Sequence, residues 1–500
     1  MCKSHQSPTR KNVVIVGAGP AGLLATILLL RRNHAQSTDT TYHVTLVDPG
    51  ADYGKMDADG LNRARSWMIG LSCHGLSAIR EVPDLYERYI HGLGIDITKA
   101  RIGLSKRIKF EVNAKDILPD DSAFTVDRNY ICAALSRYIN DNFGNDENFT
   151  SYYTHRALYV DGANQCLISR PVEDPLKDDV NIHYDILLGC DGIRSVVRNA
   201  FINAHRDFEF DIRGTFGYGK SLHVALPPDV DEGTFMFINN ALPDWNSFIL
   251  PETGRQMNVA LGTALNRKCP PELESTDPKV VAEYFRKHWH VFPMDVDDAG
   301  EQWVNQGWNT ISQVHCNFYH SLKLNALLLG DAAHATSPQI GQGMNTALAD
   351  ASILNTLLDE YKDDWKSVLP KFSELRVKEG NALTDLSFHT FSLNPSTQIK
   401  LMINAQIRQT LNKYLPWLVE PDPMNEIPKG MKLSEAYNRM MKFGVIARVR
   451  NENDSIMRQH FERSVGMVTE TKRNEFLYKI VLYGLPVATA AAVMMRTKLT

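Results

Sequence analysis

Short apolar runs, each followed by small residues and then by a helical pattern, recur along the chain. They cover Asn12–Val16, His43–Asp48, Tyr184–Gly189 and Ala326–Leu329. Runs of this length, rich in Val, Ile and Leu, are typical of strands buried on both faces of a parallel sheet. After the last run, Met344–Leu358 places apolar residues at helical spacing. The pattern predicts an α/β fold in which parallel strands alternate with helices.

The pattern changes between residues 214 and 265, where apolar and polar positions alternate. Residues 222–226, 234–238 and 258–262 are expected to be strands, and turn residues separate them. This section predicts a mostly antiparallel sheet. Its aromatic residues Phe237, Trp245 and Phe248 are assigned to ordinary sheet core in preference to a ligand pocket. After residue 360 the pattern is mostly helical, with helices expected over 381–391 and 398–415.

The last apolar segment, residues 476–495, differs from the rest of the chain. No residue from Ile480 to Met495 is charged, and basic residues flank the segment on both sides. Sixteen helical residues would span roughly 24 Å, against about 30 Å for a bilayer core. A C-terminal membrane anchor is favoured over a buried core helix, because Tyr478 and Tyr483 lie near one end.

Composition and charge exclude several other classes of protein. A chain of 500 residues with 43% hydrophobic and 22% charged residues is typical of a globular protein with a sizeable core. The net charge of -4 gives no electrostatic reason to expect nucleic acid as a partner. Seven scattered cysteines form no CxxC pair, so no zinc site is expected. The polar N-terminus indicates no secretory signal, so an intracellular protein is expected.

The first strand runs directly into a GxGxxG motif and then into a helix, which is the context that a dinucleotide-binding turn requires. Within this motif, one glycine permits the turn, the next lets backbone approach a pyrophosphate, and the last lets helix pack on strand. The candidate cofactor residues here are Gly17, Gly19, Pro20, Ala21 and Gly22, and Asp48 would bind a ribose hydroxyl. The alternative is a Rossmann-like turn with no ligand.

Two further turns contribute candidates. Asp191 follows shortly after the third run. The loop after the fourth run consists mainly of small residues, which lets a flat ligand approach the backbone. The free N–H groups that open the following helix favour an anion or an electron-rich atom. The candidates in this loop are Gly330, Asp331, Pro338, Gly341, Gly343, Met344 and Asn345. An ordinary strand-to-helix joint is the alternative for both turns. Arg65 and Arg128 face either the nucleotide or solvent and nearby acids.

These three turns occur in the order and spacing of the single-component flavoprotein aromatic hydroxylases, which the chain resembles. This is the group similar to p-hydroxybenzoate hydroxylase, and the segments around Arg65–Ser72, Arg128 and Asp385–Ser387 resemble the kynurenine 3-monooxygenases within it. The resemblance implies non-covalent FAD, NADPH or NADH as reductant, molecular oxygen, a C4a-hydroperoxyflavin and a small aromatic substrate. It also implies FAD contacts at Gly70 and Leu158, a substrate carboxylate bound by Arg101, a second substrate contact at Tyr437, and a mitochondrial outer membrane location.

The fold expected from pattern and resemblance is a discontinuous Rossmann-like FAD-binding domain with an inserted antiparallel sheet. Its parts are residues 10–205 and 321–365 for FAD, 206–320 for the substrate sheet, 366–470 for a helical region and 476–495 for the anchor. The chain departs from the resembled pattern at Gln339, Ile340 and Thr390, which leaves the substrate open. A flavin epoxidase or oxidase acting on a lipid, and a non-catalytic flavoprotein module, are the alternatives. His334 is assigned no catalytic role.

Overall fold

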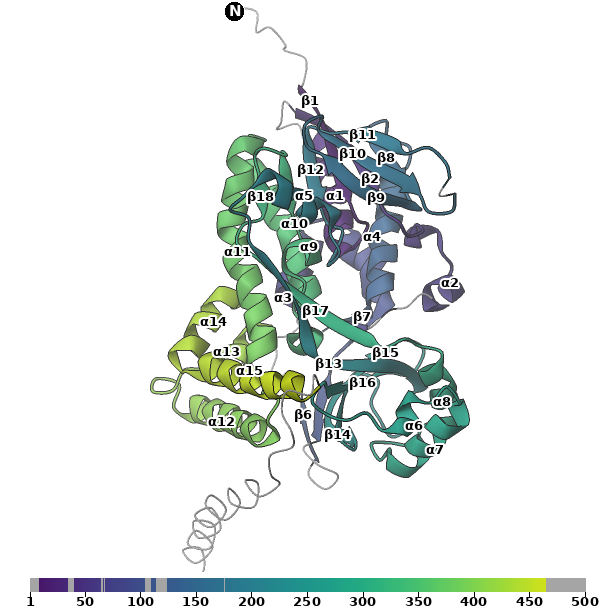
Figure 1. Ribbon diagram of the computed structural model, residues 1–500, viewed down its shortest axis with the longest axis vertical. Coiled ribbons are helices and arrows are strands. Elements are labelled where there is room, and N and C mark those ends of the chain that lie inside the picture. Colours follow the sequence, from purple (N-terminus) through teal and green to yellow (C-terminus); the bar gives the residue numbers. More distant parts are fainter. Residues whose placement is uncertain are drawn as a thin grey trace, which may run out of the picture.

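The computed structural model describes residues 9–34, 40–63, 66, 68–103, 109–113, 124–174 and 176–464. Its first layer is a six-stranded sheet in the order β18-β19-β12-β1-β2-β8, in which only the β18–β19 pairing is antiparallel. The strands come from segments that lie far apart along the chain (Figure 1). Their bounds are β1 Thr9–Val16, β2 Thr40–Val47, β8 Phe149–Tyr152, β12 Ile186–Gly189, β18 His320–Ser321 and β19 Ala326–Leu328.

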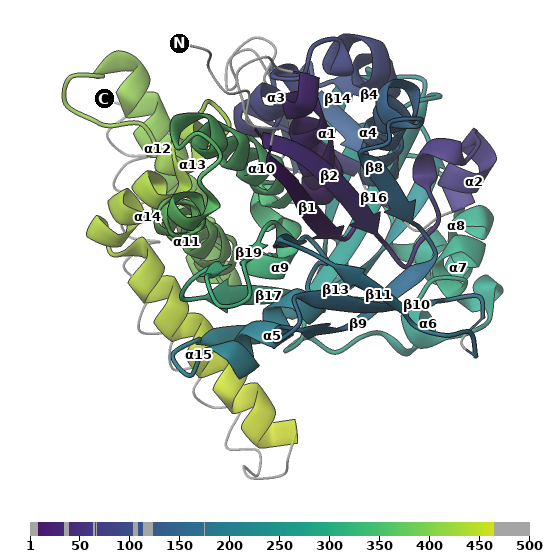
Figure 2. The same ribbon diagram turned by 90° about the horizontal axis from the view of Figure 1, so that it is seen from above.

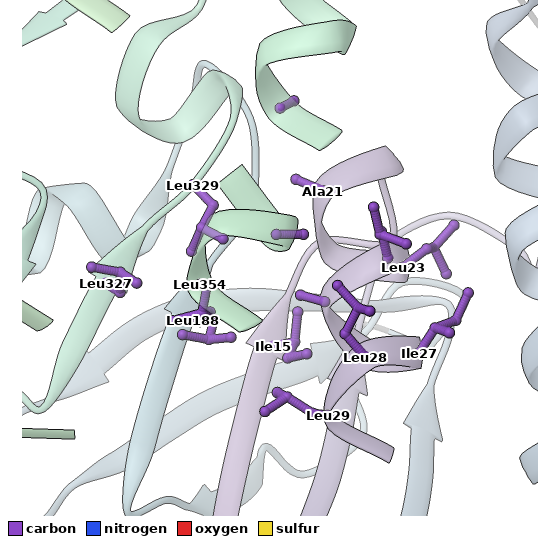
Figure 3. Packing of buried hydrophobic residues seen from close by; sticks show 14 of the residues in the cluster. Ile15, Ala21, Leu23, Ile27, Leu28, Leu29, Leu188, Leu327, Leu329 and Leu354 are labelled. Atoms are coloured by element: carbon purple, nitrogen blue, oxygen red, sulfur yellow. The ribbon is translucent and has the colours of Figure 1, made fainter. Parts of the chain in front are cut away.

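The core of this sheet follows directly from the apolar runs. Val13 to Val16 are all buried, because helix α1 covers one face of β1 and the strands of residues 155–183 lie against the other (Figure 2). Figure 3 shows side chains of β1, β12, β19 and α1 (Pro20–His34) filling the space between these elements. Helix α1 packs against α10 (Gly343–Glu360) and α4 (Arg128–Phe143), so it is buried almost all round. The parallel strands and the helices that follow β1, β12 and β19 confirm the predicted α/β class.

The second layer is a seven-stranded sheet in the order β17-β13-β16-β15-β14-β5-β6, antiparallel except where β14 meets β5. Trp245, Trp303 and Phe285 form the centre of its core, so Trp245 is a core residue as expected. The bounds are β5 Lys99–Gly103, β6 Lys109–Asn113, β13 Phe210–Ala225, β14 Thr234–Leu242, β15 Trp245–Glu252, β16 Gln256–Ala264 and β17 Asn309–Cys316. Helices α6 Pro271–Glu274, α7 Pro278–His288 and α8 Val296–Val304 lie beside this sheet (Figure 1).

Smaller elements connect the two layers. Residues 85–93 form a π-helix followed by a 3-10 turn. The elements are η1 Tyr53–Lys55, α2 Ala58–Arg63, β3 Met68–Leu71, α3 Cys73–Arg80, η2 Leu85–Ile90, η3 His91–Leu93, β4 Gly94–Asp96, β7 Phe124–Asp127, β9 His155–Asp161, β10 Cys166–Pro171, β11 Val180–His183, α5 Val196–Ala204, α9 Asp331–His334 and η5 Pro338–Ile340.

A group of helices follows residues 329–342, the segment between β19 and α10 that we call the flavin-type loop. These helices contact both sheets. Helix α11 is longer than the pattern indicated: it begins at Trp365 and ends at His389, and it packs against α10, β17 and η5. The remaining bounds are α12 Pro395–Tyr414, α13 Pro423–Glu426, α14 Leu433–Lys442 and α15 Val445–Ser464. The expected anchor at 476–495 lies outside the described residues. Among the helices that are described, none combines the length and apolar character that crossing a bilayer needs.

Candidate functional site

Two glycines of the first turn are in close contact with neighbouring backbone, and the third faces open space. Gly17 has a φ of +106°, and a Cβ there would lie 2.3 Å from the Cys190 carbonyl oxygen. A Cβ on Gly22 would lie 2.0 Å from the Gly17 carbonyl oxygen, whereas a Cβ on Gly19 would meet nothing within 4 Å. Gly17 and Gly22 are therefore required by close packing, and Gly19 leaves its backbone accessible to a ligand.

Asp48 ends β2 beside this turn. Its Oδ2 accepts a hydrogen bond of 2.7 Å from the Ala18 N–H, and its Oδ1 accepts one of 2.6 Å from the Gly50 N–H. A carboxylate has about four acceptor positions, so two remain for hydroxyl groups of a ligand. Next to Asp48 is a cavity of about 110 Å³. Its lining includes Gly19, Asp48, Tyr53, Arg128, Cys132, Ser136 and Tyr153.

Arg128 opens α4 and brings a guanidinium to the same cavity. Burial lowers the pKa of this group, but Cys132 and the carboxylate of Asp331 raise it, and the balance is upward. The cation therefore lies within electrostatic reach of the loop that follows β19. The predicted residues Gly19, Asp48, Arg128 and Asp331 are thus brought together from four elements.

The three small-residue turns meet one another. The first and second are in contact where Gly17 approaches Cys190. Arg198 of α5 joins the second and third, because its guanidinium donates to the carbonyl oxygens of Ile193 at 2.6 Å and Ala332 at 2.8 Å. The third approaches the first where a Cβ on Gly330 would lie 3.3 Å from that of Ala21.

Asp191 shapes the second turn from within. Its Oδ2 accepts hydrogen bonds from the N–H groups of Val196 at 2.6 Å and Val197 at 3.3 Å, at the start of α5. Burial raises the pKa of the Asp191 carboxyl, although these bonds act in the opposite direction. The Asp191 side chain therefore stabilises the helix start, which is the purely structural alternative for this residue.

A buried ionic cluster fixes the third turn. Asp350 accepts hydrogen bonds from Gly330 N at 2.8 Å and from Arg376 Nε at 2.6 Å, and it contacts His334 Nε2 at 2.7 Å. Burial alone would raise the pKa of Asp350, but His334 and Arg376 lower it to about 2. The Nε2 atom of His334 is engaged in this cluster, in agreement with a structural role.

The loop that leads into α10 exposes backbone and buries its asparagine. Gly341 has a φ of +65° and, like Gly70, would place a Cβ in open space. Asn345 is completely buried: its Oδ1 accepts from Ser72 N at 2.8 Å, and its Nδ2 donates to the carbonyl oxygens of Gly70 at 2.9 Å and Gly341 at 3.0 Å. Its side chain therefore ties β3 to the loop, so only its backbone remains for the expected FAD contact.

Leu158 and Arg101 are not among the described residues that line the cavity. Leu158 lies in β9, in a three-stranded sheet, and Arg65 lies outside the described residues. Arg101 on β5 forms an ion pair of 3.0 Å with Glu111 on the neighbouring strand β6. The expected carboxylate-binding cation therefore already has a partially exposed anionic partner.

Tyr437 lies in α14 among apolar residues that include Ile340 of the flavin-type loop. Burial and the nearby Asp385 raise the pKa of its hydroxyl, whereas the nearby Arg450 lowers it, and the sequence did not single out these two residues as a pair. Asp385 also lies 3.8 Å from His315 and 4.0 Å from His389. The residues of this polar cluster come from β17, α11, α14 and α15. No local sequence pattern could therefore predict it.

His389 is the most deeply buried member of that cluster, with 3% of its surface exposed. Burial, together with the nearby cations Arg450 and Arg213, lowers the pKa of its imidazole to about 3. Its Nδ1 has no hydrogen-bond partner among the residues that the structure describes. The imidazole is therefore neutral near pH 7 and retains an unused polar atom.

Comparison with known proteins supports the cofactor. Residues 171–385 match the family described as FAD binding domain. Violacein synthase of Chromobacterium violaceum is 26% identical over 443 residues, which cover 86% of this chain and 96% of that protein. Kynurenine 3-monooxygenase of Anopheles gambiae is 27% identical over 452 residues, 86% of this chain and 83% of that protein. The chain is a flavin-dependent monooxygenase.

Solved structures agree on the fold of this flavin-dependent monooxygenase. PqsL of Pseudomonas aeruginosa, titled a probable FAD-dependent monooxygenase, superimposes with a TM-score of 0.56 at 15% identity and covers 80% of this chain and 99% of its own. A 2-methyl-3-hydroxypyridine-5-carboxylic acid oxygenase gives 0.56 at 15% identity, over 86% and 98%. Together with the sequence relatives, these structures confirm the predicted Rossmann-like FAD-binding fold and the enzyme class.

Proposed function

We propose that the protein hydroxylates a small aromatic substrate, with FAD as cofactor and NADPH or NADH as reductant. When bound, FAD supplies reduction by the nicotinamide and activation of molecular oxygen through a C4a-hydroperoxide. The observation that carries the proposal is the meeting of three turns beside Asp48 and Arg128, with open backbone at Gly19 and Gly341. A dinucleotide with a flat ring system needs acceptors, a cation and open backbone at its nucleotide end, and open backbone again beside its ring system.

Each part of this centre has a defined task in the proposal. The open backbone at Gly19 and the N-terminus of α1 bind pyrophosphate, and the free acceptor positions of Asp48 bind ribose hydroxyls. Arg128 offsets negative charge from the phosphate side. Around Gly341, backbone N–H groups at the start of α10 stabilise negative charge on the ring system.

The substrate side is formed by the seven-stranded sheet and the helices after α10. The relatives act on small aromatic compounds by name: one is a kynurenine 3-monooxygenase, and one PqsL structure is titled as a complex with 2-aminobenzoylacetate. We propose an aromatic acid for this chain, with its carboxylate on Arg101 and its ring near Tyr437. Glu111 must then release Arg101, which costs little because partially exposed ion pairs contribute about 1 kcal/mol or less.

Anaerobic reduction of the bound flavin by NADPH, measured across a panel of aromatic acids, tests the function. A substrate should accelerate bleaching and, with oxygen present, yield a hydroxylated product. A non-catalytic flavoprotein would respond to no compound in the panel, and a lipid epoxidase would respond to a lipid instead.

Replacement of Arg101 tests the proposed substrate contact. Arg101→Ala should raise the substrate concentration for half-maximal stimulation at least tenfold, since a carboxylate loses a charged partner worth about 1.5–3 kcal/mol. FAD content should not change. Arg170→Ala is a matched control, because Arg170 makes a similar exposed pair with Asp179 on an unrelated strand. Loss of FAD from the Arg101 variant would instead assign this residue to the cofactor site.

A further inference from the structure

Helix α12 turns its apolar side toward solvent. Ile399, Ile403, Ile407 and Leu411 repeat every four residues along it, and each is between 42% and 51% exposed. Beyond the end of the helix, Trp417 is 79% exposed and Leu418 is 73% exposed. The four helical residues form one apolar stripe, since positions four apart share a helix face, and Trp417 and Leu418 follow beyond its end. We refer to them, together with Tyr414, as the α12 face.

The opposite side of α12, which lies against the protein, combines polar residues with Leu401, Met402 and Ala405. Arg408 places its guanidinium 4.0 Å from the centre of the Phe443 ring, and Asn412 donates to the carbonyl oxygen of Val419. The branched residues Ile399, Ile403 and Ile407 are thus on the exposed side, where core packing would not place them. No residue of α12 is fully buried, and each isoleucine keeps about half of its surface exposed.

The charges of α12 show which partner suits this face. Its charged residues are Lys400, Arg408 and Lys413, and no acidic residue occurs from 395 to 419, whereas the whole chain carries a net charge of -4. Two copies of such a face would repel each other. An apolar face with basic flanks, and with Tyr and Trp at one end, matches the interface of a membrane that carries anionic lipid.

We propose that the α12 face binds an anionic lipid surface, with the helix lying in the plane of the interface and not crossing it. Figures 1 and 2 both show α12 at the edge of the molecule, away from the parallel sheet, so a flat surface can reach it. The proposed lipid contact involves residues 395–418 alone and does not depend on the flavin chemistry. It is also separate from any role of residues 476–495.

Trp417 provides a local probe for this contact in the full chain. Vesicles of phosphatidylcholine with phosphatidylserine, made with brominated acyl chains, should quench the fluorescence that is lost when Trp417 is changed to Tyr. Vesicles of phosphatidylcholine alone should quench it much less. Vesicle binding without quenching at Trp417 would overturn the proposal, because another segment would then hold the lipid.

Acrylamide quenching in the absence of vesicles identifies the competing occupant. If the apolar C-terminal segment of the chain covered the α12 face, Trp417 would be shielded from acrylamide before lipid is added and would not respond to vesicles. That result would also overturn the proposal. Free access of acrylamide, reduced by anionic vesicles, is the expected outcome.

Matched variants separate the apolar and electrostatic contributions. Ile403→Glu with Ile407→Glu should abolish the quenching, whereas Ile202→Glu, at a similarly exposed position on α5, should leave it unchanged. Lys400→Gln and Lys413→Gln should each weaken binding to anionic vesicles by about fivefold, and added salt should reduce this difference. Equal effects of the α5 and α12 changes would overturn the assignment to this face.

Discussion

Residues of the same type have different roles at this site. Gly17 and Gly22 are required because a side chain would collide with backbone, whereas Gly19 faces open space. A substitution at either kind of position can abolish flavin binding, but for different reasons. One reason concerns the fold and the other concerns the ligand.

Gly19→Ala and Gly22→Ala form a pair that separates these reasons. Gly22→Ala should destabilise the protein without cofactor by at least about 1–3 kcal/mol, because its Cβ would lie 2.0 Å from the Gly17 carbonyl oxygen. Gly19→Ala should leave that stability nearly unchanged but weaken FAD binding roughly tenfold or more, about 1.4 kcal/mol. Thermal unfolding and flavin titration measure the two effects. Equal loss of stability in both variants would contradict the distinction.

His389 predicts a loss of stability in mild acid. Its folded pKa of about 3 lies below the usual 6.5, so protons bind the unfolded chain first. Stability is therefore complete above about pH 6.5 and declines as pH falls toward 3, by about 1.4 kcal/mol for each pH unit between the folded and unfolded pKa values. Unfolding midpoints between pH 5 and 8 should fall less steeply for His389→Gln than for the unchanged chain. His34→Gln, at an exposed position, should keep the original slope.

At the scale of elements, Asp350 joins three helices to the third turn. It lies in α10 and holds Arg376 of α11, His334 of α9 and the backbone of Gly330. The position of the flavin-type loop thus depends on a buried carboxylate that itself needs no ligand. Since the pKa of Asp350 is lowered to about 2, its contribution is complete above about pH 4 and lost as pH falls through 2.

Asp350→Asn should therefore act on both stability and cofactor. Arg376 would be left buried without its anion, which costs about 3–5 kcal/mol, and FAD affinity should fall because Gly330 loses its anchor. Asp359→Asn is the control: it removes an acid that pairs with Arg32 but is itself largely exposed. This control should lose about 1 kcal/mol or less in urea unfolding. A similar loss in both variants would show that the Asp350 cluster has no special role.

At the scale of the whole molecule, one sheet is built from segments that lie far apart in the sequence. Strand β12 pairs with β1 on one side and with β19 on the other, although about 140 residues separate β12 from β19. A ligand held by all three turns therefore connects segments that are distant in sequence. Its binding must be coupled to global stability.

Removal of FAD should lower the unfolding temperature of the entire chain. A ligand at 100 times its dissociation constant adds about 2.7 kcal/mol to the folded state, which corresponds to a rise of several degrees. Calorimetry with increasing FAD should show a midpoint that climbs with the logarithm of the flavin concentration. A midpoint that does not move with FAD would mean that the three turns do not form its site.

The sequence alone determined which segments form the flavin-type core. Strands buried on both faces require unbroken apolar runs, and the turns beside them require small residues, so both are visible locally. This is why β1, β2, β12, β19 and the candidates Gly17 to Gly22 were predicted from short stretches. The antiparallel middle sheet was predicted for the same reason, because its side chains alternate between two environments.

Only the tertiary structure decided how individual side chains are used. Asn345 bonds to Gly70 and Ser72, and Asp385 meets Arg450 and Tyr437, through contacts between segments that are far apart in sequence. The helical pattern of α12 likewise could not reveal that its isoleucines point outward. A helix period fixes which residues share a face, but only the packing of neighbouring elements decides whether that face meets the core or the solvent.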